Sequence, residues 1–156
     1  LTAVAEQAFE TYLHHVIRQM GTAARTSTSE LDNTGRQLLG DFYRGAHAAG
    51  SEPPPDGTQH VVLINTMDRP PGEHWMCLYR EPSDAYSRGE QLLYDSFGRL
   101  PSTQWQPRLR GIETTERDPE QVETYEDGSK TEYCGQACLA WACVAHAYGW
   151  NVARLV

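Results

Sequence analysis

The sequence predicts an α+β fold in which a mixed or antiparallel central sheet packs against helices. Three observations support this prediction. Apolar residues recur every three or four positions near the N-terminus, buried strand patterns follow between residues 60 and 96, and an apolar helix lies near the C-terminus. This order differs from the repeated βα units of a parallel α/β fold. With 156 residues and 39% hydrophobic content, the chain fits a single compact unit.

The first element is an amphipathic helix. Its apolar residues recur at helical spacing over Leu1–Met20, and Gly21 is a suitable residue to end it. Residues 22–29 are small and polar, which is typical of a linker. We therefore expect residues 1–28 to form an N-terminal helix and linker, and residues 29–156 to form the main domain of one compact unit.

A second, shorter helix and a turn are expected over Glu30–Tyr43. Its inward-facing residues would be Leu31, Leu38, Leu39 and Phe42. Gly50–Gly57 contains three consecutive prolines and is predicted to be a stiff surface loop.

The sheet begins where the hydrophobic period changes. The β-branched run His60–Thr66 predicts a buried strand, and His74–Arg80 and Gln91–Ser96 predict two more. The loops between them are short enough for antiparallel hairpins. Two further short strands are expected at Ile112–Arg117 and Val122–Tyr125.

The last helix carries the most informative motif. Residues 137–148 are apolar and Gly149 ends them, whereas Cys134 stands at the helix start. The positive end of a helix dipole favours a thiolate over a thiol, so this position suits a nucleophile. Gly135, directly after it, would allow a substrate backbone to come close.

Two other segments supply residues that a thiol nucleophile needs. His74, at the start of a predicted strand, is a candidate general base, and Asp95, at the end of another, is a candidate for orienting its imidazole. Acyl transfer also requires a donor to the developing oxyanion. Gln121 is the only glutamine between residues 111 and 133, and backbone N–H groups at Cys134 and Gly135 are further candidates.

Each of these residues also has an ordinary interpretation. Cys134 is compatible with a core cysteine, His74 with a surface histidine, Asp95 with a turn cap and Gln121 with an exposed side chain. A zinc site is a rival interpretation of the last helix, through Cys134, Cys138, Cys143 and His146. Side chains at this spacing spread around a helix axis and do not close a tetrahedron, so we expect no metal and no other cofactor.

Charge and composition restrict the partners. A net charge of −8 argues against a general nucleic-acid-binding surface, and no apolar run approaches the roughly 20 residues of a membrane span. Four cysteines without a secretory signal predict free thiols in a reducing intracellular compartment. A chain that starts at Leu1 suggests processing from a longer polypeptide.

Taken together, these segments resemble the adenovirus-protease-like (adenain-like) cysteine peptidases, which are related to the deSUMOylating ubiquitin-like proteases. The resemblance covers about Ser29 to Tyr148, and the order and spacing of its motifs carry it. The matching pieces are Leu38-Leu39-Gly40-Asp41, Ile64-Asn65-Thr66, Pro71-Gly72-Glu73-His74-Trp75, Tyr94-Asp95-Ser96-Phe97-Gly98 and Tyr133-Cys134-Gly135-Gln136-Ala137-Cys138.

The resemblance implies a permuted papain-like arrangement with the nucleophile at the start of a central helix. His74 matches the family's base, Asp95 its orienting acid and Cys134 its nucleophile. Gln121 would be the oxyanion-hole glutamine, although it lies farther from the cysteine than is usual, and residues 126–130 look like an insertion.

The implied activity is that of a cysteine endopeptidase that matures a viral polyprotein or capsid, in a host cell or virion. Two alternatives stay open: an isopeptidase that acts on ubiquitin-like modifiers, and a catalytically silent capsid or scaffold relative. The expected partners are protein or peptide substrates, among them viral structural proteins or ubiquitin-like modifiers. A nucleic-acid or peptide activator is also open, and no membrane partner is expected.

Overall fold

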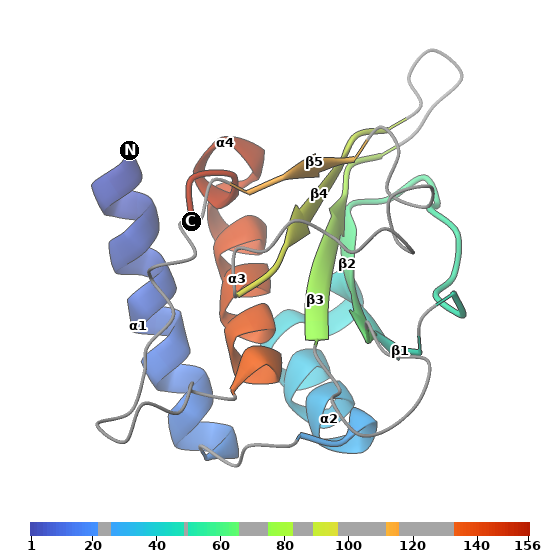
Figure 1. Cartoon of the computed structure of the whole chain (residues 1–156), viewed down its shortest axis with the longest axis horizontal. Helices are drawn as coiled ribbons and strands as arrows, with labels where there is room; N and C mark the ends of the chain where they lie inside the picture. Colours follow the sequence, from blue (N-terminus) through green and yellow to red (C-terminus); the bar gives the residue numbers. More distant parts are fainter. Residues whose placement is uncertain (22–25, 49, 66–74, 83–88, 97–111, 116–132) are drawn as a thin grey trace.

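The computed structural model describes residues 1–21, 26–48, 50–65, 75–82, 89–96, 112–115 and 133–156. It confirms the α+β class (Figure 1). In chain order the elements are α1 (Thr2–Met20), α2 (Thr28–Leu39), the 3-10 turn η1 (Gly40–Phe42), β1 (Tyr43–His47), β2 (His60–Asn65), β3 (Trp75–Arg80), β4 (Gln91–Tyr94), β5 (Glu113–Thr114), α3 (Cys134–Tyr148) and α4 (Trp150–Ala153). The expected strand at Val122–Tyr125 lies outside the described residues.

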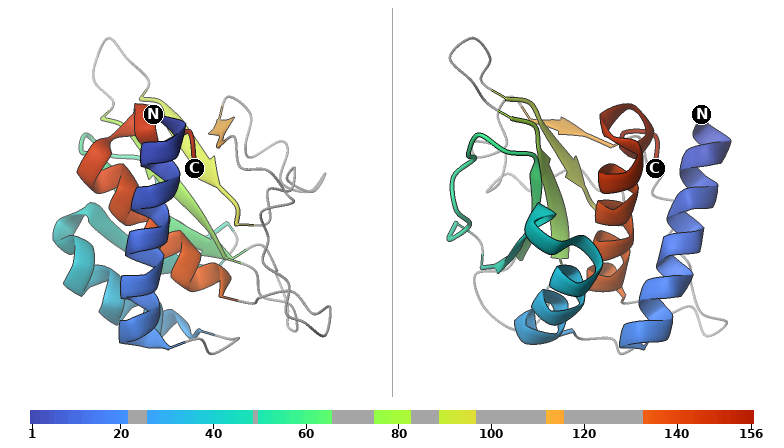
Figure 2. Two further views of the ribbon diagram at one scale, coloured as in Figure 1. Left: turned by 90° about the vertical axis from the view of Figure 1, so that its left-hand side faces the viewer. Right: turned by 180° about the vertical axis from the view of Figure 1, so that it is seen from behind.

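The strands form one mixed sheet in the order β1-β2-β3-β4-β5. The pairs β2/β3 and β3/β4 are antiparallel, as predicted, whereas β1/β2 and β4/β5 are parallel. The helices gather on one side of the sheet, and α3 lies between the sheet and α1 in Figure 1 and in the right-hand view of Figure 2. This layering places α3 at the centre of the molecule.

Side-chain alternation along the strands builds an apolar cluster on each face of the sheet. Val61 and Leu63 of β2 belong to the large core shared with the helices, whereas Val62 and Ile64 belong to a smaller cluster on the other face. All six residues of β2 are buried, which agrees with the buried strand predicted from its β-branched run.

Helix α3 is apolar on all sides, which is typical of a helix enclosed by other elements. Residues 134–145 are all buried. The Trp141 ring stacks on Tyr94 of β4 with centroids 5.3 Å apart and planes at 6°, and its indole N–H donates to the Ala153 carbonyl at 3.0 Å. These contacts fix α3 against the sheet and hold the short α4 against α3.

The segment before the sheet differs from the prediction. Ser27 caps α2 by accepting a hydrogen bond from the Glu30 amide at 3.1 Å, so the helix starts at Thr28, inside the expected linker. The chain then forms β1, for which no strand was predicted. Asp32 stabilises this strand because one of its carboxylate oxygens accepts from the Tyr43 hydroxyl at 2.8 Å and from the Ala46 amide at 2.9 Å.

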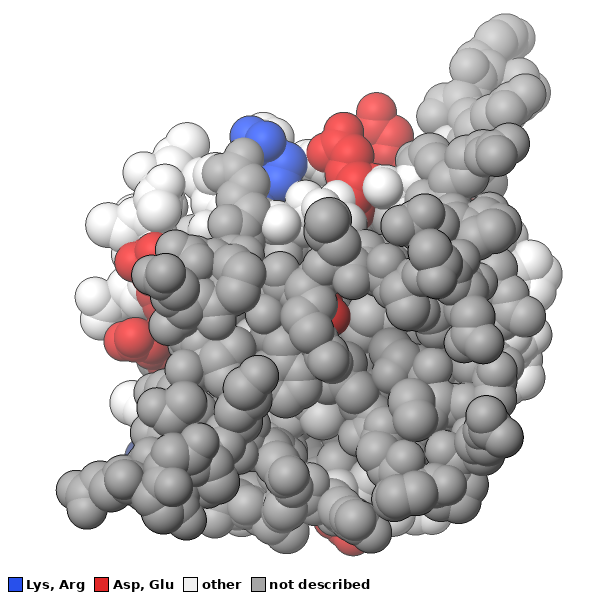
Figure 3. Space-filling model, in the orientation of Figure 1, with Lys and Arg blue, Asp and Glu red and all other residues white. Residues whose placement is uncertain are grey.

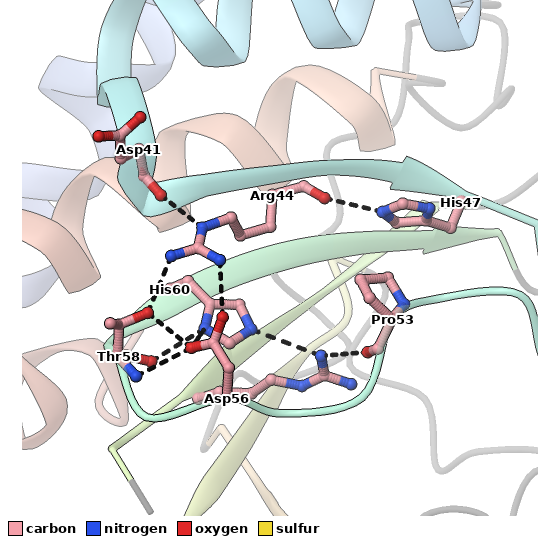
Figure 4. Close-up of polar contacts among 8 residues, drawn as sticks. Asp41, Arg44, His47, Pro53, Asp56, Thr58 and His60 are labelled. Atoms are coloured by element: carbon pink, nitrogen blue, oxygen red, sulfur yellow. Dashed lines mark hydrogen bonds and ion pairs between the residues drawn. The ribbon is translucent and has the colours of Figure 1, made fainter.

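A polar cluster lies at one end of the sheet, where strands β2 and β4 begin and β3 ends (Figure 4). Arg44 forms an ion pair with Asp56 at 2.7 Å, and the buried Arg80 donates to the Pro53 carbonyl at 2.6 Å. The loop 53–58 is thereby held against the start of β2.

The buried His60 is neutral in this cluster. Its Nδ1 donates to the Thr58 carbonyl at 2.9 Å, and its Nε2 lies 3.5 Å from the Arg80 guanidinium, where only an unprotonated nitrogen can accept. Burial, as the main cause, lowers the pKa of His60 below its usual 6.5 despite the opposing effects of Thr58 and Asp56.

This lowered pKa predicts a stability that falls at acid pH. The unfolded chain binds a proton at His60 more readily than the folded one, so the contribution is complete above about pH 6.5 and is lost as pH falls through the folded-state pKa. The loss is at most about 1.4 kcal/mol per pH unit for one group. Urea unfolding at pH 7.5 and 5.5 measures this loss in the free energy of unfolding. His60→Gln should make the difference between the two pH values smaller. His14→Gln, on the exposed face of α1, should leave the difference unchanged. If the free energy of unfolding changed equally with pH in wild type and in His60→Gln, this assignment would be wrong.

None of the helices in the described part of the chain is long and apolar enough to cross a membrane.

Candidate active site

The candidate nucleophile lies at the start of α3, as predicted from the motif. Cys134 is the first residue of the helix, and its side chain is 9% exposed. The first hydrogen bond of this end runs from the Ala137 amide to the Tyr133 carbonyl at 2.9 Å. The amides of residues 134–136 precede that bond, so the sulfur sits at the positive end of the helix dipole.

The start of β3 contacts this cysteine directly. The Trp75 backbone N–H donates to Cys134 Sγ at 3.4 Å, although 59 positions separate the two residues. Trp75 immediately follows the candidate base His74 in the sequence. The fold therefore brings the residue next to the predicted base into contact with the predicted nucleophile.

The candidate acid, Asp95, lies near the end of the sheet at which β3 starts. Because β3 and β4 are antiparallel, the end of β4 lies beside the start of β3, and Tyr94 pairs with Cys77. Asp95 follows Tyr94 and is buried. It is close enough to α3 for its charge to contribute to the raised pKa of Cys138. Cys134 thus contacts Trp75 directly, and Asp95 follows the strand that pairs with β3.

Close packing explains why position 135 is a glycine, which the sequence alone did not show. A Cβ at this position would lie 2.5 Å from Thr26 Oγ1 and 2.9 Å from Leu31 Cδ2. The side of Gly135 that a Cβ would occupy is therefore filled by the segment leading into α2. The structure explains this glycine by the close approach of α2 and α3, rather than by the approach of a substrate that the sequence suggested.

The next residue of the motif, Gln136, is directed into the protein. Its side chain is fully buried, and its amide donates to the Gly21 carbonyl at 3.1 Å, which ties α3 to the end of α1. This glutamine therefore has a structural contact.

The other three cysteines are buried in the core. Cys77 and Cys138 are fully buried, and burial raises the pKa of each thiol well above its usual value. Burial likewise raises the pKa of Cys143 to about 12. All four cysteines are free. Because the thiolate is the reactive form, these three side chains are poor nucleophiles at neutral pH.

Two predicted site residues, His74 and Gln121, lie outside the described residues. The structure describes the other two predicted residues, Cys134 at the start of α3 and Asp95 directly after β4, and Cys134 contacts the backbone of Trp75. Sequence reasoning missed the contribution of Trp75, because a backbone N–H leaves no signature in a sequence. It also missed the contact in which Cys138 Sγ donates to the Trp75 carbonyl at 3.3 Å. The available signal was the position of Cys138, four residues after Cys134 on the same helix.

The described residues give little support to other kinds of site. Among them, no three His, Cys, Asp or Glu side chains are grouped so as to hold a metal ion. On the face shown in Figure 3, the described acidic side chains appear in several places and the described basic ones form no continuous patch.

Comparison of the chain with protein-family models, with curated proteins and with solved structures gives no match. The α+β fold and the residues around Cys134 are therefore the basis for any functional conclusion.

Proposed function

We propose that this chain is a cysteine peptidase in which Cys134 attacks a peptide carbonyl. His74 takes the thiol proton and returns it to the leaving amine, and Asp95 orients His74. Gln121 and the backbone amides at the start of α3 stabilise the oxyanion. The finer fold assignment that goes with this proposal is a permuted papain-like arrangement.

The observation that carries the proposal is the 3.4 Å contact between the Trp75 amide and Cys134 Sγ. It brings the residue beside the candidate base to the candidate nucleophile, at the sheet edge to which Asp95 also belongs. Core packing alone does not require a cysteine at a helix N-terminus that accepts a hydrogen bond from the start of β3.

The substrate is a protein or peptide, and we favour the maturation of viral structural proteins in a reducing compartment. Fluorogenic peptides and modifier-derived substrates with Gly-Gly ends, assayed side by side, separate endopeptidase from isopeptidase activity. A chain that cleaves neither set would instead support a silent relative.

Selective alkylation tests the nucleophile. Sub-stoichiometric iodoacetamide at pH 7 should label Cys134 first, because the pKa values of Cys77, Cys138 and Cys143 are raised by burial. Mass spectrometry of the digested protein identifies the labelled cysteine. Peptide cleavage should decline in proportion to the labelled fraction. First labelling at another cysteine, or full cleavage by protein labelled at Cys134, would refute the proposal.

A further inference from the structure

The Trp75 peptide is held by two thiols of the same helix. Cys134 and Cys138 are four residues apart, so they lie on one face of α3. The Trp75 N–H donates to Cys134 Sγ at 3.4 Å, and Cys138 Sγ donates to the Trp75 carbonyl at 3.3 Å. A single residue at the start of β3 thus has both of its backbone polar groups bound to α3 sulfurs.

The chemistry of the two contacts differs. A carbonyl oxygen can only accept, so Cys138 must be protonated to make its hydrogen bond. Burial, with smaller effects from Cys77, Cys134 and Asp95, raises the pKa of Cys138 well above its usual value, and its thiol keeps the proton at neutral pH. At Cys134 the sulfur is the acceptor, and an N–H donor binds a thiolate more strongly than a thiol.

We propose that Cys138 is a positioning residue, which holds the Trp75 carbonyl so that the Trp75 N–H stays directed at Cys134 and stabilises its thiolate. This inference rests on the proposed function, in which that thiolate is the nucleophile. It adds a role for a buried thiol that would otherwise be a small apolar filler of the core. The same contact fixes the start of β3, directly after the candidate base His74.

The test measures thiolate formation at Cys134 without using peptidase activity. The rate of iodoacetamide alkylation at Cys134 is followed from pH 5 to 9 by mass spectrometry of the whole chain. Cys138→Ala removes the donor to Trp75. We expect the rate at pH 7 to fall roughly three- to tenfold and the midpoint of the profile to move to higher pH, as for the loss of one hydrogen bond that favours the charged form.

Three further variants separate positioning from packing. Cys138→Ser keeps a donor and should stay within about twofold of wild type, whereas Cys138→Val fills the space without a donor and should match Cys138→Ala. The Val variant also serves if the alanine variant fails to fold. Cys143→Ala removes a buried thiol of the same helix that makes no hydrogen bond to the described residues, and it should leave the profile unchanged.

Profiles of Cys138→Ala and Cys138→Val that superimpose on that of Cys143→Ala would overturn the positioning role. The alkylation profile and the cleavage assay together distinguish a failure of this inference from a failure of the proposed function. A shifted alkylation profile in a protein that cleaves no peptide would uphold the Cys138 contact and refute the peptidase. Peptide cleavage by the wild-type chain, together with an unshifted alkylation profile in the Cys138 variants, would uphold the peptidase and refute the positioning role of Cys138.

Discussion

Replacing Cys134 with alanine is expected to abolish peptide cleavage while the protein stays folded. The substitution removes the sulfur that attacks the carbonyl, and loss of a nucleophile commonly lowers kcat by several orders of magnitude. The fold should survive because alanine suits a helix and the change removes one atom from a side chain at the helix end. Measurement of kcat/KM on a cleaved peptide, with circular dichroism to confirm folding, tests this expectation.

Cys143→Ala is the matched control for this substitution. It makes the same change on the same helix, at a buried site, and should retain cleavage within about twofold. Its stability should fall by the modest amount expected for a small deletion in a core. If Cys134→Ala still cleaved at a tenth of the wild-type rate, Cys134 would have no part in bond cleavage.

Helices α1, α2 and α3 and the central strands could be predicted because each carries a local signal in its own sequence. The β-branched apolar run of β2 can be recognised without tertiary information, and so can the three-and-four spacing of α1. Strand β1 carries no such signal: Tyr43-Arg44-Gly45-Ala46-His47 has one large apolar residue and a glycine. It is a strand because β2 pairs with it and Asp32 binds it, which is a tertiary effect that overrides local preference.

Short elements were missed for a related reason. Helix α4 has four residues, too few to show a helical period. One of the contacts that position it is the hydrogen bond from the Trp141 indole to the Ala153 carbonyl. A sequence indicates that Trp141 is buried, but it does not indicate which backbone carbonyl its N–H will find.

The candidate site likewise contains residues that could be predicted from local sequence and contacts that could not. The sequence predicts Cys134 because a helix start and a following glycine are local features, and Asp95 because it ends a strand. The convergence of Trp75 with Cys134 depends on the register of β3 and on how α3 lies across the sheet, so no local pattern encodes it. The same holds for Gly135. A side chain at this position would collide with Leu31, which lies about a hundred positions earlier in the chain.

Substituting His74 with alanine is expected to reduce peptide cleavage as severely as the loss of Cys134. A base and its nucleophile act as one unit, so removing either removes nearly the whole contribution of both. Combining His74→Ala with Cys134→Ala should therefore lower kcat/KM little further than either change alone. His14→Ala, on the exposed face of α1, is the matched control and should cleave at the wild-type rate.

Asp95→Asn gives the order of effects that the proposed roles require. It should reduce kcat less than His74→Ala, because asparagine keeps a hydrogen-bonding side chain at a buried position while losing the charge that stabilises an imidazolium. Cleavage kinetics of the single and double variants under one set of conditions decide the matter. If Asp95→Asn were the most damaging single change, or if the His74 and Cys134 effects multiplied, the assignment of base and orienting acid would be wrong.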